Sequence, residues 1–115
     1  AVRTDYVAEN LSAKGAYDGR TTTSTRTGSR VRLTFTGDQV ALLATKGPGR
    51  GRVRVRIDGR TVAIVDLRAS RTSMRRIVLA RAVGAGRHTI EVVHLKRPGG
   101  RAGRVDIDGF LYTQP

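Results

Sequence analysis

The stretch Arg52 to Leu67 reads RVRVRIDGRTVAIVDL, and it decides the fold of this chain. Its first half alternates arginine with apolar residues, which is the two-residue period of a β-strand with one buried and one solvated face. The pair Asp58-Gly59 follows and is typical of a type I′ turn, because both central positions of that turn need positive φ. The stretch therefore predicts a β-hairpin. Its expected inward residues are Val53, Val55 and Ile57, and its expected outward residues are Arg52, Arg54 and Arg56.

The rest of the chain repeats this strand pattern and shows no helical period of useful length. Fourteen glycines separate the apolar runs. At 115 residues the chain predicts one domain, an all-β antiparallel β-sandwich or jelly roll of about eight strands. Besides the hairpin, strands are expected within residues 29–37, 39–44, 75–81, 88–95 and 104–114, with a weaker opening segment at 5–11.

The composition limits the chemistry that the chain can perform. Cysteine is absent, so disulfides and thiolate chemistry are excluded. No apolar run reaches 18 residues, and the opening AVRTDYVAENLS lacks the basic-then-apolar order of a secretion signal. We expect a domain excised or processed from a longer protein, although the same absence fits a cytoplasmic protein.

Positive charge is the most pronounced feature of the composition. There are 22 Lys and Arg against 9 Asp and Glu, a net charge of +13. Such a field attracts nucleic acid, anionic membrane surfaces or acidic polysaccharides. The alternative is that arginine-rich codon usage has produced an ordinary soluble surface.

Strand order predicts where this charge gathers. If successive strands are antiparallel, alternate loops lie at the same end of the sandwich. The short connections at 37–38, 58–60 and 83–87 would share one end, and the longer loops at 17–28, 45–51, 68–74 and 96–103 the other. Asp18 is the only acid in the longer loops. The ligand-binding residues that we expect at this end are Tyr17, Arg20, Lys46, Arg50, Arg71, Lys96, Arg97 and Arg101, and the same loops carry Arg26 and Arg68.

From Ser29 onward the chain resembles bacterial carbohydrate-binding modules of the galactose-binding-like jelly-roll class. The resemblance rests on the stretches VRLTFTGDQVALLA (31–44), GRVRVRIDGRTVAIVDL (51–67), RRIVLARAVGAGRHTIEVVHL (75–95) and GRVDIDGFLY (103–112). It implies a non-catalytic glycan-attachment domain, one part of a longer extracellular or cell-surface protein.

The aromatic content departs from that family. Such modules commonly stack a sugar on tryptophan or tyrosine, but this chain has no tryptophan. Phe35 and Phe110 occupy core positions of strands, so Tyr17 is the one aromatic residue expected in a long basic-end loop. This favours an acidic polysaccharide or cell-wall glycan, for which arginine supplies the affinity.

The remaining titratable residues favour structural roles. His88 and His94 lie about 20 Å apart on one strand and cannot hold one metal ion, and we expect His88 to satisfy backbone groups. Asp58, Asp66, Asp106 and Asp108 form no recognisable catalytic arrangement, and no enzyme or cofactor is predicted. The resemblance implies one alternative, a structural calcium held by Glu9 and Asp108.

The sequence thus predicts a non-catalytic module for an acidic polysaccharide or cell-wall glycan, and it leaves two alternatives open. One is nucleic-acid or general polyanion binding through an outer arginine strip, Arg30, Arg32, Arg52, Arg54 and Arg56, if the two strands that carry it are neighbours. The other is a structural spacer or assembly domain.

Overall fold

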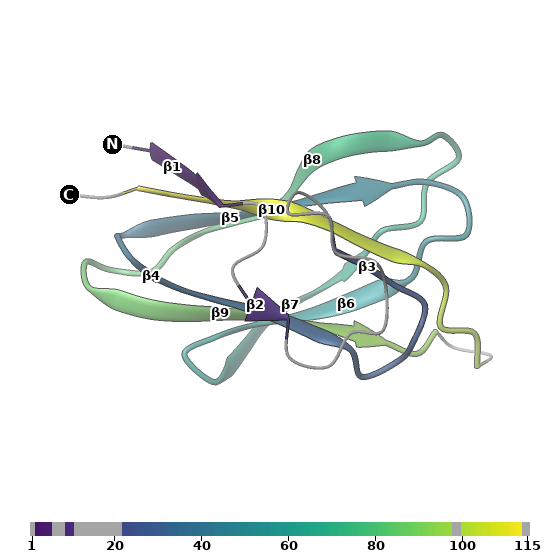
Figure 1. Ribbon diagram of the computed structural model, residues 1–115, viewed down its shortest axis with the longest axis horizontal. Coiled ribbons are helices and arrows are strands. Elements are labelled where there is room, and N and C mark those ends of the chain that lie inside the picture. The colour runs from purple at the N-terminus through teal and green to yellow at the C-terminus, as the bar shows by residue number, and fades with distance from the viewer. Residues whose placement is uncertain (1, 6–8, 11–21, 98–99, 114–115) are drawn as a thin grey trace.

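The domain is a sandwich of two antiparallel β-sheets (Figure 1). The structure is a computed structural model and describes residues 2–5, 9–10, 22–97 and 100–113. Sheet A has the order β1-β10-β5-β8, with β3 also paired to β10, and sheet B has the order β2-β4-β9-β6-β7. The strands are β1 (Val2–Asp5), β2 (Glu9–Asn10), β3 (Thr22–Ser24), β4 (Arg30–Thr36), β5 (Gln39–Lys46), β6 (Arg52–Ile57), β7 (Arg60–Asp66), β8 (Ser73–Ala82), β9 (Arg87–Leu95) and β10 (Val105–Thr113).

The predicted all-β sandwich is confirmed, and so are the seven strands expected between Ser29 and Gln114. In the β6–β7 hairpin, Asp58 and Gly59 both have positive φ, 51° and 81°, as a type I′ turn requires. No helix among the described residues is long and apolar enough to cross a membrane.

The core lies between the two sheets and is built from alternate residues of each strand. Val53 and Val55 are fully buried, and Ile57 is nearly so, as their spacing predicted. Phe35 and Phe110 are buried as well, and the Tyr112 ring lies against Phe35 with 5.3 Å between the ring centroids. The described aromatic side chains therefore belong to the core or pack against it.

The order of strands in sheet B does not meet the condition that the sequence set for an outer arginine strip. The two arginine-bearing strands, β4 and β6, are not neighbours, because β9 lies between them and pairs with both. Glu91 of β9 stands opposite Arg32 on one side and Arg56 on the other. A carboxylate therefore separates the two rows of outward arginines, which reduces the repulsion between them.

The two ends of the sandwich differ as the alternation of loops predicted. At the tight-turn end, Gly37 N donates to Gly86 O and Val83 N donates to Asp38 O, so the β4–β5 and β8–β9 connections lie together. The longer loops meet at the opposite end, at the right of Figure 1. Strand β1 and the C-terminal end of β10 also lie at the tight-turn end (Figure 1).

His88 holds the tight-turn end together, which confirms its expected structural role. Its Nδ1 lies 2.6 Å from Asp58 Oδ2, and its Nε2 lies 2.6 Å from the Gly84 carbonyl oxygen. Both ring nitrogens face acceptors, so the protonated ring donates to both. The Asp58 carboxylate, and then the Gly84 carbonyl, raise the pKa of His88 above its usual 6.5, while His88 and the Thr89 N–H lower the pKa of Asp58.

We expect this contact to make stability fall as the medium becomes alkaline. A raised histidine pKa contributes stability that is fully present below about pH 6.5 and is lost as pH rises through the folded-state pKa. Thermal unfolding followed by circular dichroism at about pH 6 and about pH 8.5 would show a lower Tm at the higher pH. His88→Gln should flatten that difference, and an equal fall in Tm for both proteins would contradict the assignment.

Candidate functional site

The longer loops form one hydrogen-bonded surface, here called the loop rim: residues 25–29, 46–51, 67–72, 96–97 and 100–104. The β5–β6 loop lies in its middle and bonds to a loop on each side. Gly47 N donates to Leu67 O at 3.0 Å, and Gly51 N donates to Arg104 O at 2.9 Å. The rim is therefore a connected backbone layer, suited to presenting side chains in fixed positions.

Two glycines allow the loops to approach so closely. A Cβ atom on Gly51 would lie 2.3 Å from the Ala102 carbonyl oxygen, and one on Gly103 would lie 2.9 Å from the Gly51 backbone. Gly103 also has a φ of 70°, which side-chain-bearing residues rarely adopt. Backbone contact between the β5–β6 and β9–β10 loops thus depends on the absence of side chains at both positions.

The buried Asp106 carboxylate of β10 fixes the Arg50 side chain at the centre of the rim. Asp106 is 3% exposed and accepts hydrogen bonds from the Thr23 hydroxyl at 2.7 Å and from Arg104 Nε at 3.0 Å. Arg50 Nε lies 3.0 Å from its other oxygen, in an alignment that makes an ion pair rather than a hydrogen bond. Asp106 therefore pairs with two cations and connects β3, β10 and the β5–β6 loop.

Arg97 makes the second internal connection of the rim. Its Nε and one terminal nitrogen donate to the Arg50 carbonyl oxygen at 3.1 and 2.8 Å, and the guanidinium also pairs with the Asp66 carboxylate. Burial works to raise the pKa of Asp66, but the Arg68 N–H and the Arg97 guanidinium outweigh it and hold the pKa below its usual range. Asp66 is thus a charged anchor for the β9–β10 loop.

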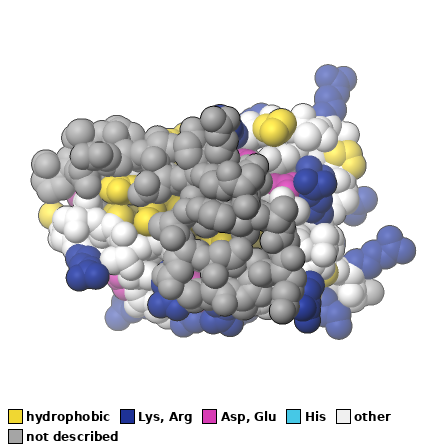
Figure 2. Space-filling model, in the orientation of Figure 1, with side chains coloured by type: hydrophobic (Ala, Val, Ile, Leu, Met, Phe, Trp, Pro, Cys, Tyr) yellow, Lys and Arg dark blue, Asp and Glu magenta, His cyan; other side chains and the backbone are white. Residues whose placement is uncertain are grey.

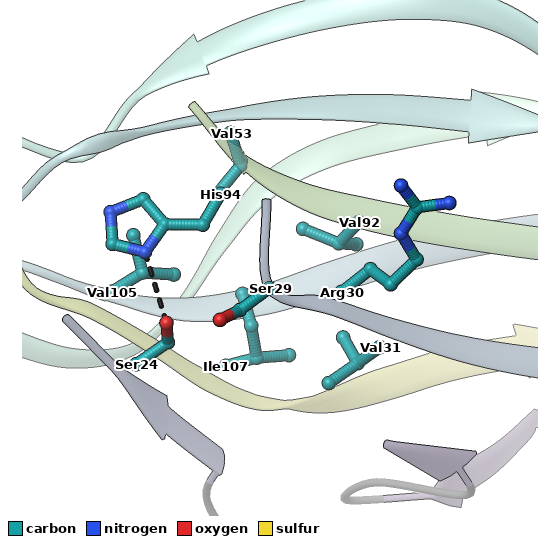
Figure 3. Close-up of a pocket in the computed structure, with 9 residues that line it drawn as sticks. All are labelled: Ser24, Ser29, Arg30, Val31, Val53, Val92, His94, Val105 and Ile107. Atoms are coloured by element: carbon teal, nitrogen blue, oxygen red, sulfur yellow. Dashed lines mark hydrogen bonds between the residues drawn. The ribbon is translucent and has the colours of Figure 1, made fainter. Parts of the chain in front are cut away.

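His94 supports the rim from beneath. It is 2% exposed, with Nε2 2.7 Å from the Ala102 carbonyl oxygen and Nδ1 3.1 Å from the Ser24 hydroxyl (Figure 3). The adjoining cavity is about 20 Å³, room for one water molecule and far too small for a sugar. This cavity therefore cannot hold a sugar ring.

The structure divides the sequence-predicted site residues into three groups. Arg50 and Arg97 lie in the rim, but they are engaged in the contacts just described. Tyr17 and Arg20 lie outside the described residues. The other four, Lys46, Arg71, Lys96 and Arg101, come from three loops or strand ends of the rim, and none of them forms an ion pair with a described carboxylate.

Sequence reasoning missed that two acids outside the loops serve the rim. It treated Asp18 as the only loop acid, whereas Asp66 at the end of β7 and Asp106 in β10 supply the carboxylates that Arg97 and Arg50 bind. For Asp106 the sequence did contain a signal, an aspartate inside a strand. Burial of such a carboxylate costs free energy unless a cation is near, so a cationic partner was to be expected. The partner of each aspartate is remote in sequence, so the signal could not identify the pair.

Asp108 also occupies a structural position. It is 1% exposed and accepts hydrogen bonds through Oδ2 from the Thr45 hydroxyl at 2.9 Å and the Arg75 N–H at 3.2 Å. The described residues contain no group of three His, Cys, Asp or Glu side chains able to hold a metal ion. The Glu9 side chain lies outside the described residues, so the calcium alternative stays a prediction.

Two surfaces of the domain are strongly basic. Figure 2 shows Lys and Arg side chains at the right-hand end, which carries the loop rim, and along the lower side, where sheet B lies. Sheet B presents the outward arginines of β4 and β6. The loop-rim end and sheet B are therefore two places where an anionic partner would meet positive charge.

The sandwich and its loop rim define a jelly-roll module. The CBM36-1 domain of a multidomain xylanase from the hindgut metagenome of Trinervitermes trinervoides is similar, with a TM-score of 0.62 at 16% identity over 100% of this chain and 97% of that chain. A family 35 carbohydrate-binding module from Clostridium thermocellum has a TM-score of 0.63 at 12% identity over 99% of both chains. The predicted fold and its resemblance to carbohydrate-binding modules are confirmed.

The family follows from a match that covers most of the chain. A family model described as carbohydrate esterase 2 N-terminal matches residues 16–114, and the chain belongs to that family. A family two carbohydrate esterase from Clostridium thermocellum, solved in complex with cellohexaose, has a TM-score of 0.61 at 19% identity over 100% of this chain and 34% of that chain. The chain thus spans about a third of that esterase's length. Comparison with curated protein sequences gives no significant match.

We expect loss of the buried Asp106 charge to destabilise the domain much more than loss of an exposed partner. Asp106→Asn leaves Arg50 without its counter-charge and should lower the free energy of unfolding by about 3 kcal/mol. The matched change Arg104→Gln removes a side chain that is 54% exposed and should cost less than about 1 kcal/mol. Urea unfolding followed by circular dichroism measures both, and equal costs would contradict a central role for Asp106.

Proposed function

We propose that this domain is a non-catalytic module that attaches a longer protein to a glycan, with the loop rim as its contact surface. The observation that carries the proposal is the set of cations left over at the rim. Lys46, Arg71, Lys96 and Arg101 extend from a surface whose internal ion pairs already occupy Arg50 and Arg97. These four charges have no described carboxylate partner, which suits them to an external anion.

The burial and pairing of the aspartate carboxylates support a binding role rather than a catalytic one. Glycoside hydrolysis needs two carboxyl groups facing one substrate bond. Here Asp106 and Asp108 are buried and accept hydrogen bonds from fixed donors, while Asp58 and Asp66 pair with His88 and Arg97. The described carboxylates at both ends of the sandwich thus serve the fold.

The relatives support a glycan as the ligand. Two are named as carbohydrate-binding modules, and one esterase was solved with cellohexaose. The esterase is about three times the length of this chain, which supports a module that works beside other domains. By the same comparison we propose an extracellular or cell-surface location.

The rim's chemistry favours an acidic glycan. Neutral sugars are commonly held by an exposed aromatic ring, whereas the described rings of Phe35, Phe110 and Tyr112 are buried or packed in the core. Arginine and lysine bind carboxylate or sulfate groups through charge-assisted hydrogen bonds. We propose that these cations supply most of the affinity and that Tyr17 and Arg20 complete the surface.

Charge reversal at the rim tests this proposal. Lys96→Glu combined with Arg101→Glu should weaken binding to polygalacturonate at least about tenfold, because two charge-assisted contacts become repulsive. Isothermal titration at low and high salt would measure the affinity. A control with the same change in net charge, Arg60→Glu with Arg81→Glu, alters exposed arginines away from the rim and should have a smaller effect.

Two outcomes would contradict the proposal. Equal weakening by both double variants would mean that net charge alone attracts the polymer. Failure of the unaltered domain to bind polygalacturonate, neutral glycans or DNA would instead favour a structural spacer. Retention of binding at high salt would indicate a shaped site, since purely ionic binding is screened.

A further inference from the structure

The outer face of sheet B carries a second concentration of charge, separate from the loop rim. Outward residues of β4, β9 and β6 fall into rows that cross the three strands. One row is Arg32, Glu91 and Arg56, and the next is Arg30, Val93 and Arg54. We call these six residues the arginine face. Rows of this kind are roughly 6.6–7 Å apart along the strands, and the two outer strands are about 10 Å apart.

Charge on this face is compensated in part by Glu91, and the register of sheet B also places Glu9 of β2 opposite Arg32 at the edge of the face. Glu91 is the only carboxylate within β4, β9 and β6. It lies 3.8 Å from Arg30, 4.0 Å from Arg32 and 3.6 Å from Arg56, so three guanidiniums share one acid at long range. Their side chains remain about two-fifths exposed. An anionic ligand would therefore relieve repulsion that the protein leaves in place.

The face is also hollowed at one place. A concavity of about 330 Å³ lies between Arg32 and Arg56, with Glu91 and Thr89 in its lining and the Asp58-Gly59 turn at its end. This volume is at the lower end of the range of small-ligand sites. It is near the tight-turn end, so it cannot be an extension of the loop rim. Guanidinium donors and a carboxylate acceptor stand within one shallow site.

We propose that the arginine face is a second binding surface, which takes a polysaccharide bearing both carboxylate and hydroxyl groups. Arg32 and Arg56 would bind the ligand carboxylates as planar forks, and Glu91 would accept hydroxyl hydrogen bonds between them. The choice of a glycan rests on the proposed function, whereas the surface itself does not.

The same groups argue against a nucleic acid on this face. Proteins that bind single-stranded nucleic acid stack its bases on aromatic rings. The outward residues of β4, β6 and β9 on this face include arginine, threonine, glutamate and valine, which offer no such ring. Glu91 at the centre of the hollow would repel a closely spaced phosphate chain. A sugar hydroxyl, by contrast, can donate to that carboxylate.

A substitution of Glu91 distinguishes the proposed glycan site from attraction by charge alone. The probes are a galacturonic acid hexasaccharide, the neutral galactose hexasaccharide and oligothymidylate, each titrated calorimetrically against the folded domain. Glu91→Gln should weaken hexagalacturonate binding severalfold, because the charged carboxylate acceptor for the sugar hydroxyls is replaced by an amide with one weaker acceptor oxygen. If the face attracted polyanions by charge alone, the same change would strengthen binding of both hexagalacturonate and oligothymidylate, and the proposal would be overturned.

Double variants distinguish the contribution of the arginine face to binding from the contributions of the loop rim and of net charge. Arg32→Gln with Arg56→Gln should weaken hexagalacturonate binding at least about tenfold, whereas the equal charge change Arg60→Gln with Arg81→Gln should have little effect. If only Lys96→Glu with Arg101→Glu weakened binding, the arginine face would be excluded while the proposed function stood. Failure of the unaltered domain to bind any saccharide would overturn both.

A measurement on the unaltered protein tests the proposal without relying on the correct folding of any variant. In nuclear magnetic resonance titrations, the backbone amides of Thr89, Glu91 and Arg56 should shift with hexagalacturonate and not with the neutral hexasaccharide. Shifts confined to the rim would overturn the proposal. Stronger perturbation of these amides by oligothymidylate would assign the face to nucleic acid instead.

Discussion

The pairing of Arg50 with the buried Asp106 is the interaction on which the loop rim depends. Asp106 lies on sheet A, and its pairing brings Arg50 and the β5–β6 loop against β10. The Arg50 carbonyl then receives Arg97, which in turn binds Asp66 at the edge of sheet B. One chain of contacts therefore joins both sheets across the open end of the sandwich. A charge buried without its partner costs several kcal/mol, so the loops are held to this arrangement.

This network divides the arginines into two kinds. Arg50 forms an ion pair with Asp106, and Arg97 donates to the Arg50 carbonyl oxygen and the Asp66 carboxylate, so the charge of both arginines contributes mainly to the fold. The exposed cations of the rim and of sheet B have few or distant acids, so their field extends into solvent. A change at either kind of residue can reduce polyanion binding. Only the first kind should also change the free energy of unfolding.

The alternation of residues and the Asp58-Gly59 pair were enough to predict the seven strands β4 to β10, the hairpin and the buried side of β4 and β6, whereas β3 lies within the segment 17–28 that was expected to be a loop. The alternation of loop ends also placed the rim correctly, because antiparallel strands leave little choice. Strand order within a sheet was beyond this reasoning, since nothing in the local pattern of β9 indicates that it lies between β4 and β6. The roles of Arg50 and Arg97 were missed for the same reason, as their acidic partners are distant in sequence.

The position of Glu91 shows why a count of charges describes this domain poorly. Solubility alone would not require the arginines to stand in register across a sheet around Glu91, although the register does reduce the repulsion between them. The register also produces a mixed site, with donors at its sides and an acceptor between them. Under our proposal, such a site would distinguish a ligand that carries both hydroxyl and carboxylate groups from one that carries charge alone. The specificity of the domain would then depend on its few acids as much as on its many arginines.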